Sequence, residues 1–92
     1  MDNSEVKLMT AKVNDELLKI AEATEPQQEI PVIVTITADA NLTALEQKGL
    51  KIQHSFKNIS AVSGTLPAAE INALSQLDEV ERIEYDSKAW AL

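Results

Sequence analysis

The stretch from Ile30 to Thr37, IPVIVTIT, constrains the fold most strongly. It is short, rich in β-branched residues and apolar on both of its faces, which is typical of a strand buried on both sides. Such a strand usually lies in the middle of its sheet. The sequence therefore predicts a sheet built around residues 30–37.

The segment after this strand predicts a short helix. Asp39 or Asn41 can cap its first turn, because a side-chain oxygen accepts a bond from a free backbone N–H there. Leu42 and Leu45 give the helix an apolar side, and Gly49 marks its end.

Two further strands are predicted next, joined by a tight turn. The alternation in residues 50–56 places four side chains on one apolar face: Leu50, Ile52, His54 and Phe56. Lys57 and Asn58 are the expected turn, since asparagine tolerates left-handed dihedral angles. Residues 59–66 read as the third strand.

A second helix and a last strand complete the pattern. Pro67 is expected to open the helix, whose apolar face carries Ile71, Leu74 and Leu77. The last strand runs from Val80 to Asp86. The resulting order, β-α-β-β-α-β, predicts an α+β fold of the ferredoxin-like type, with an antiparallel four-stranded sheet and two helices on one face.

The N-terminal residues predict an additional amphipathic helix, from Asp2 to about Thr24. An apolar residue recurs every three or four positions: Val6, Met9, Val13, Leu17 and Ile20. We therefore expect two parts, residues 1–28 as helix and linker and residues 29–92 as the main domain. The apolar stripe covers the sheet of its own chain, forms a marginally stable helix, or pairs with a second copy or another protein.

Composition excludes several classes of function. The chain has 92 residues, 15 acidic and 8 basic side chains, a formal charge of -7 and no cysteine. Disulfide frameworks, zinc knuckles and thiol nucleophiles are thereby excluded. The negative charge makes nucleic acids and anionic membranes poor partners. No apolar run is long enough to span a bilayer, and the N-terminus lacks the pattern of a signal peptide, so a cytoplasmic location is expected if Met1 is the native start.

Candidate catalytic and metal-binding residues are scarce. His54 is the one histidine, and Ser55 beside it on the strand points to the opposite face, so the pair cannot act as nucleophile and base. We interpret His54 as a histidine at the edge of the core. The carboxylates of Glu79, Glu81, Glu84 and Asp86 are interpreted as a solvated strand edge. No enzyme activity, metal or cofactor is expected.

Two stretches resemble a known family. Residues 56–66, FKNISAVSGTL, and residues 80–86, VERIEYD, are similar to the propeptides of subtilisin-like serine proteases and to stand-alone inhibitors related to them. The resemblance runs from Ile30 to Leu92 and leaves the first helix outside. It implies a protein inhibitor of a subtilisin-like serine protease, which can also assist folding of the protease.

The same resemblance implies a binding site at the end of the chain. The open face of the sheet would pack on two surface helices of the protease, and Glu84 and Asp86 would cap the N-termini of those helices. The tail would lie in the substrate cleft as an extended strand, with four contact residues: Ala89, Trp90, Ala91 and Leu92. Leu92 would fill the primary specificity pocket. The alternative from the residues alone is an interaction or oligomerisation module of the same fold.

Overall fold

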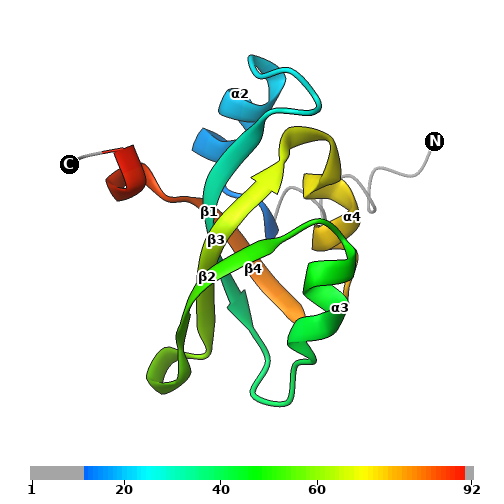
Figure 1. Cartoon of the computed structure of the whole chain (residues 1–92), viewed down its shortest axis with the longest axis vertical. Coiled ribbons are helices and arrows are strands. Elements are labelled where there is room, and N and C mark those ends of the chain that lie inside the picture. The colour runs from blue at the N-terminus through cyan, green and yellow to red at the C-terminus, as the bar shows by residue number, and fades with distance from the viewer. Residues whose placement is uncertain (1–11, 91–92) are drawn as a thin grey trace.

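The computed structural model describes residues 12–90 and contains one antiparallel sheet (Figure 1). Its strands are β1 (Glu29–Ile36), β2 (Lys51–Phe56), β3 (Ala61–Pro67) and β4 (Val80–Tyr85). Their order across the sheet is β2-β3-β1-β4, and every pair of neighbours is antiparallel. The interior position of β1 confirms what its two apolar faces predict.

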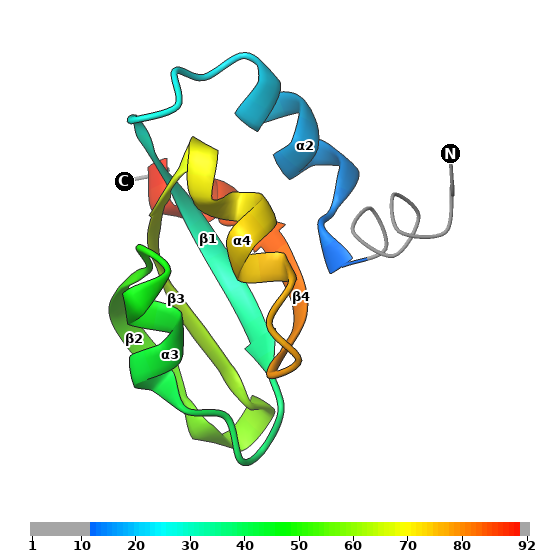
Figure 2. The ribbon, with the colours of Figure 1, turned by 90° about the vertical axis from the view of Figure 1, so that its right-hand side faces the viewer.

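Three α-helices accompany the sheet: α2 (Asp15–Glu22), α3 (Leu42–Gln47) and α4 (Ile71–Ser75). Figure 2 shows α3 and α4 side by side on one face of the sheet, with α2 beside β4. The β-α-β-β-α-β order from β1 to β4 confirms the predicted α+β, ferredoxin-like fold, here with an additional helix. None of the helices that the structure describes is long and apolar enough to cross a membrane.

The core lies between the sheet and the helices. Alternate residues of β1 point into it, because successive side chains of a strand face opposite ways. Strands β3 and β4 and the three α-helices supply most of the remaining side chains, and Val13 and Leu50 come from the segments before α2 and β2. The buried cluster consists of Val13, Leu17, Ile30, Val32, Val34, Ile36, Leu45, Leu50, Val62, Leu66, Ile71, Leu74, Val80 and Ile83.

Local signals fix both ends of α3. Of the two predicted capping residues, Asn41 is the one used, and its side chain accepts a hydrogen bond of 3.0 Å from the backbone N–H of Thr43. Gly49 follows the helix with a φ of 103°, a left-handed conformation that glycine adopts without a steric penalty.

The predicted N-terminal helix is partly wrong. Residues 2–11 lie outside the described part of the chain. Val13 is not helical but forms a parallel bridge with Ile83 of β4. Asn14 then caps α2 by accepting a hydrogen bond of 2.9 Å from the N–H of Leu17, so a new helix begins at residue 15. The capping geometry at Asn14 outweighs the apolar periodicity that runs through it.

This N-terminal segment is attached to the edge of the sheet at several points. The backbone N–H of Asn14 donates to the carbonyl of Ile83 at 3.0 Å, and the ammonium of Lys12 donates to the carbonyl of Leu77 at 3.1 Å. The side chain of Leu17 is fully buried. The described part of the apolar stripe is therefore used within the chain, where it extends the core beyond β4.

The predicted facing of β2 is wrong because the strand contains a β-bulge. The register shifts between Ile52 and His54. Ile52 pairs with Gly64 on the helix side, whereas His54 pairs with Ser63 on the other face and is exposed. An inserted residue turns every later side chain to the opposite face. His54 is consequently a surface residue and not a core-edge residue.

Gly64 makes this bulge possible. A Cβ atom at this position would lie 2.0 Å from the carbonyl oxygen of Lys51. No side chain can be accommodated at that distance without moving the backbone of β2. The glycine is therefore required by close packing of the two strands rather than by its own dihedral angles.

The hairpin after β2 also differs from the prediction. A short 3₁₀ helix, η1 (Lys57–Ile59), replaces the simple turn. Ser60 has the left-handed conformation, with a φ of 49°, and not Asn58. Pro67 is the last residue of β3 and does not open the helix as predicted: a second 3₁₀ turn, η2 (Ala68–Glu70), follows it, and α4 begins only at Ile71. No side chain caps η2 or α4.

We predict that Gly64→Ala disrupts the β2–β3 pairing. The added methyl group collides with backbone that cannot move freely, so the free energy of unfolding should fall by about 1–3 kcal/mol. Urea unfolding measures the change. Ser63→Ala, one residue earlier on the same strand, is the control and should change stability by less than about 0.5 kcal/mol. Equal stability of both variants would contradict the close approach at Gly64.

We also predict that Leu17→Ala destabilises the whole domain, because Leu17 belongs to the common core. Removal of a fully buried leucine side chain should cost about 2–4 kcal/mol. The exposed neighbour Glu16→Ala is the control. Cooperative urea unfolding with an unchanged midpoint for Leu17→Ala would show that α2 does not contribute to the core.

Candidate functional site

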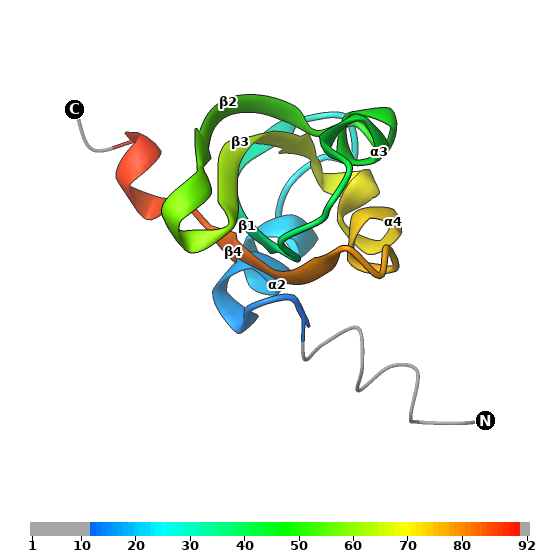
Figure 3. The ribbon, with the colours of Figure 1, turned by 90° about the horizontal axis from the view of Figure 1, so that it is seen from below.

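The face of the sheet opposite α3 and α4 carries no described helix (Figure 3). We call it the open face. The strand pairing identifies its residues, because residues directly opposite in an antiparallel pair point to the same side. They are Lys51, His54 and Phe56 of β2, Ala61, Ser63 and Thr65 of β3, Pro31, Ile33 and Thr35 of β1, and Arg82 and Glu84 of β4.

These residues form rows that cross all four strands. One row runs His54–Ser63–Ile33–Glu84. The next row runs Phe56–Ala61–Thr35–Arg82. In both rows the central positions on β3 and β1 are small or of medium size, and the outer positions on β2 and β4 carry longer side chains.

The centre of the open face is covered by neighbouring side chains of the chain itself. Ser63 is only 7% exposed and Ala61 only 4%, although no described α-helix lies over them. The longer side chains in the same rows, on β2 and β4, flank these two small residues.

One ion pair lies at the rim of the open face, where β1 begins. The ammonium of Lys51 is 2.6 Å from the carboxylate of Glu29, and the hydroxyl of Thr65 donates to the same carboxylate at 2.8 Å. The hydrogen bond from Lys51, then that from Thr65, lowers the pKa of Glu29 from its ordinary value. The group links three strands: β1, β2 and β3.

The two carboxylates expected to bind a partner lie close together at the end of β4. Glu84 pairs with Ile33 across the sheet and accepts a hydrogen bond of 3.2 Å from Arg82. The backbone N–H of Asp86 donates to the carbonyl of Pro31 at 3.0 Å, which fixes the residue beside β1. Positions 84 and 86 are two apart, so both side chains leave the strand on the same side.

Neither carboxylate has a strong internal partner. The Arg82–Glu84 pair is exposed on both sides, and such pairs contribute little stability in water. Asp86 accepts from the backbone N–H of Lys88 at 3.2 Å, which caps the turn that follows. Both groups can therefore exchange their present partners for backbone N–H groups of another protein at small cost.

The tail begins as a 3₁₀ turn, η3 (Ser87–Trp90). It leaves the sheet at the end of β4, at the edge opposite to β2 (Figure 1). Ala91 and Leu92 lie outside the described residues, and for Ala89 and Trp90 the structure describes only the backbone. The contacts implied for these four residues by the family resemblance stay predictions.

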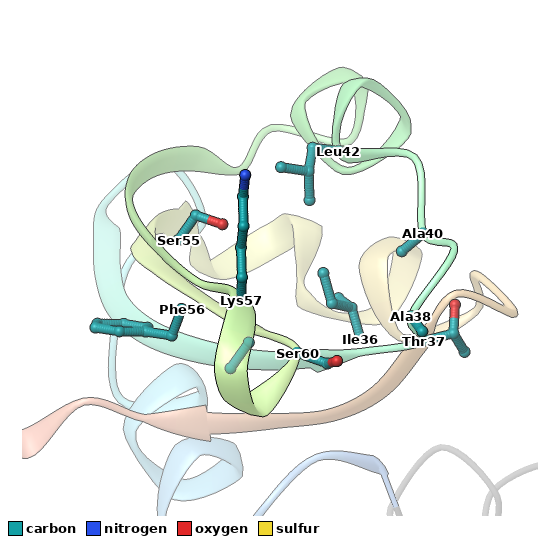
Figure 4. Close-up of a pocket in the computed structure, with 10 residues that line it drawn as sticks. Ile36, Thr37, Ala38, Ala40, Leu42, Ser55, Phe56, Lys57 and Ser60 are labelled. Carbon is teal, nitrogen blue, oxygen red and sulfur yellow. The ribbon is translucent and has the colours of Figure 1, made fainter.

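A hollow of about 290 Å³ lies between the β1–α3 loop and the β2–β3 hairpin (Figure 4). Its lining is mostly apolar, with contributions from Ile36, Ala40 and Leu42. Lys57 is the one charged residue of the lining, and no carboxylate or imidazole takes part. The described lining therefore offers one amine and no second acid–base group beside it.

A metal centre is not formed by the described residues. Within residues 12–90, no group of three or more histidine, aspartate or glutamate side chains comes close enough together to hold an ion. Glu81 and Glu84, two members of the acidic run on β4, are three positions apart and so point to opposite faces of the strand. The acidic residues of β4 therefore lie on both faces of this edge strand.

Comparison with known families decides the classification. The family model of peptidase inhibitor I9, the subtilisin propeptide-like inhibitors, matches residues 5–89. The chain belongs to the peptidase inhibitor I9 family. A search of curated proteins finds no match.

Membership of the I9 family confirms the resemblance and corrects its extent. The match begins at residue 5, so the expectation that the N-terminal helix lies outside the resemblance is wrong. The docking of Val13 and Leu17 in the common core agrees with this wider match. I9 domains are propeptide-type protease inhibitors and not catalytic domains, which fits a non-enzymatic chain.

The sequence interpretation missed one feature of the surface. The sequence predicts that Ile59 begins the third strand, but it lies in η1 and is 67% exposed. No local signal marks this difference, because serine is not among the residues enriched in the left-handed conformation that Ser60 adopts.

The lowered pKa of Glu29 predicts an acid-dependent loss of stability. Because the folded pKa is below the unfolded value, the stabilisation is complete above the ordinary carboxyl pKa of about 4.3. It is lost as the pH falls through the lower pKa of the folded protein. Glu29→Gln should reduce stability by up to about 1 kcal/mol at pH 7, since the pair is partly exposed.

The measurement is urea unfolding of both proteins from pH 7 to pH 3. The difference between wild type and Glu29→Gln should shrink as the pH falls. Glu25→Gln, an exposed position with no ion pair in the described structure, is the control and should follow the wild type throughout. A difference that stays constant with pH would exclude the ion pair as its source.

Proposed function

We propose that this chain inhibits a subtilisin-like serine protease, with its C-terminal tail bound in the substrate cleft in the manner of a cleavage product. The observation that carries the proposal is the I9 family match over residues 5–89. The body of the domain docks through the open face. The tail then occupies the cleft, with Leu92 in the primary specificity pocket and Ala89 in the pocket four residues upstream.

The position of two carboxylates supports the docking step. Glu84 and Asp86 lie on one side of the open face with only weak internal partners, at 3.2 Å in each case. A helix N-terminus offers unsatisfied N–H groups and a partial positive charge. We propose that each carboxylate caps one such terminus on the protease and thereby positions the tail that follows.

The tail has to change conformation in this proposal. Free in solution, Ser87–Trp90 form the turn η3, and Asp86 caps it through the N–H of Lys88. A strand in the cleft requires extended residues that pair with both edges of the cleft. The single capping bond is weak enough to be replaced, so unwinding of this short turn is a small obstacle to binding.

The extent of the core supports a stand-alone inhibitor over a propeptide that needs the protease for its own folding. The core includes side chains from three strands, β1, β3 and β4, and from three α-helices, and Val13 before α2 adds to it. A preordered domain loses little conformational entropy on binding, which slows dissociation. We infer that a role in protease folding is secondary here, and it would follow from preferential binding to the native protease.

The alternative of self-association through the N-terminal stripe gains no support from the described residues. Val13 and Leu17 are buried in their own chain, and Ile20 packs against the same core. Val6 and Met9 lie outside the described residues, so their pairing with a second copy stays a prediction.

We predict that a chain ending at Lys88 loses inhibition. The truncated chain lacks the residues that enter the cleft, so competition with a small peptide substrate should disappear. The inhibition constant against a broad-specificity subtilisin-type protease, measured with such a substrate, is the readout. The midpoint of thermal unfolding should stay within a few degrees of the full chain, since no core residue is removed.

A second variant distinguishes the contribution of the domain body to inhibition from that of the tail. Glu84→Gln combined with Asp86→Asn keeps the tail and removes both negative charges. It should still compete with substrate, but with weaker inhibition. Each lost interaction with a helix N-terminus is worth about 0.3–1 kcal/mol, so the combined loss should be about threefold to thirtyfold. Unchanged inhibition by the truncated chain would refute the product-like mode of binding.

A further inference from the structure

Strand β4, which leads to the two proposed docking carboxylates and the tail, is an edge strand of the sheet. On one side it pairs with β1. Along its other side lies the segment of residues 12–24, which contains α2 (Figures 2 and 3). The geometry of the carboxylates therefore depends on how firmly this segment holds β4.

The beginning of the segment is bonded to the middle of β4. Val13 forms a parallel bridge with Ile83, and the backbone N–H of Asn14 donates to the carbonyl of Ile83 at 3.0 Å. The side chains of Val13 and Leu17 are fully buried. Because backbone pairing and side-chain burial act together, the start of α2 cannot leave β4 without opening the core.

The far end of α2 is fixed through the linker that follows it. The carbonyl of Pro26 accepts a hydrogen bond of 3.0 Å from the backbone N–H of Ala69 in η2. The carbonyl of Gln28 accepts a bond of the same length from the backbone N–H of Ala68. The helix is thus attached at both ends, which gives it a fixed position against β4.

The last turn of α2 lies beside the residue that separates the two carboxylates. Tyr85 points to the opposite side of the strand from Glu84 and Asp86, because successive side chains alternate. Tyr85 and Ile20 of α2 are both half-buried against the common core, and they line one hollow of about 210 Å³. A displacement of Tyr85 into this hollow would move the backbone of both neighbouring residues.

The bond that ties the strand end to β1 reports on this geometry. The backbone N–H of Asp86 donates to the carbonyl of Pro31 at 3.0 Å. The ends of a strand open locally more often than its middle. The rate at which this one bond opens therefore measures how firmly the end of β4 is held.

We propose that residues 12–24 form a clamp that holds the end of β4 in the geometry that binds the protease. Ile20 is the central positioning residue, because it restricts Tyr85 and thereby the directions of Glu84 and Asp86. This inference rests on the proposed function, since these are the carboxylates that dock. It adds a role in inhibition itself to the contribution that the segment makes to stability.

A clamp differs in its effects from a segment that merely enlarges the core. A core contribution raises stability but leaves the affinity of the folded domain unchanged, since nearly all molecules are folded in either case. A clamp restricts the orientations of the docking residues before binding, so less conformational entropy is lost in the complex. The decisive comparison is between variants that lose similar stability at different places in the fold.

Ile20→Ala is the test variant, and Leu42→Ala is its matched control. Both side chains are half-buried and pack against the same core, but Leu42 lines the hollow at the other end of β1. Thermal unfolding without protease measures the stability that each variant loses. Ile20→Val removes a single methylene group, keeps the domain folded, and should show the effects of Ile20→Ala at smaller size.

Hydrogen exchange of the Asp86 backbone N–H, followed by NMR in the free domain, tests the clamp directly. Ile20→Ala should accelerate this exchange by about tenfold, because the strand end loses packing and opens locally. Leu42→Ala should leave the exchange rate close to that of the wild type.

Inhibition of a broad-specificity subtilisin-type protease tests the effect on binding, at a temperature where every variant is folded. Ile20→Ala should raise the inhibition constant by about threefold to tenfold, mainly through faster dissociation. The change is limited by what the two carboxylates contribute together. Leu42→Ala should stay within about twofold of the wild type.

The outcomes separate the two proposals. If Ile20→Ala leaves the exchange of Asp86 unchanged, or if Leu42→Ala weakens inhibition as much as Ile20→Ala, the clamp is wrong and the proposed function stands. If exchange accelerates without a change in inhibition, the segment stabilises the strand end but does not position the carboxylates, which also overturns the inference. If the wild type inhibits no subtilisin-type protease, the proposed function fails, and the role of the clamp in inhibition fails with it.

Discussion

The alternation of side chains along β1 is the constraint on which the rest of the structure depends. Even-numbered residues from Ile30 to Ile36 point into the core, and odd-numbered ones point to the open face. With β3 and β4 on its two sides, β1 fixes the register of both neighbours. The helices can then cover only one face. The other face carries no α-helix among the described residues (Figure 3).

The N-terminal segment protects an exposed edge of the sheet. β4 lies at an edge of the sheet, and unpaired edges invite pairing with other chains. The bridge from Val13 to Ile83, and the bond from Asn14 to the same residue, cover part of that edge. The other edge, β2, carries a bulge and Lys51, both of which disfavour strand addition. Both edges of the sheet are thereby protected against pairing with another strand.

The sequence predicts the fold well and the surface less well, for a physical reason. Strand β1 and Gly49 are strong local signals, and both are confirmed. The bulge in β2 depends on Gly64, which is distant in sequence and acts through contact with Lys51, so alternation alone placed His54 on the wrong face. The same limit applies to Asn14, where a cap interrupts a continuous apolar period.

For the proposed binding residues, too, the local sequence predicts how the side chains face but not what they bind. The facing of Glu84 and Asp86 follows from their spacing on one strand, but their role as ligands for helix N-termini comes only from family resemblance. The exposed hairpin could not be read from composition, since Phe56 and Ile59 are typical core residues. Their exposure results from the bulge and from the left-handed Ser60, two irregularities that together turn apolar side chains toward solvent.

Two-part binding explains why a short tail is sufficient in the proposed complex. In the proposed complex, residues 87–92 are extended and reach about 20 Å. A tail of this length is a weak ligand by itself, because it has few contacts and loses conformational freedom on binding. Once the open face has docked, tail binding becomes intramolecular, with an effective concentration in the millimolar range. The affinity of the tail then matters less than the geometry of the body, which is set by β1 and its two neighbours.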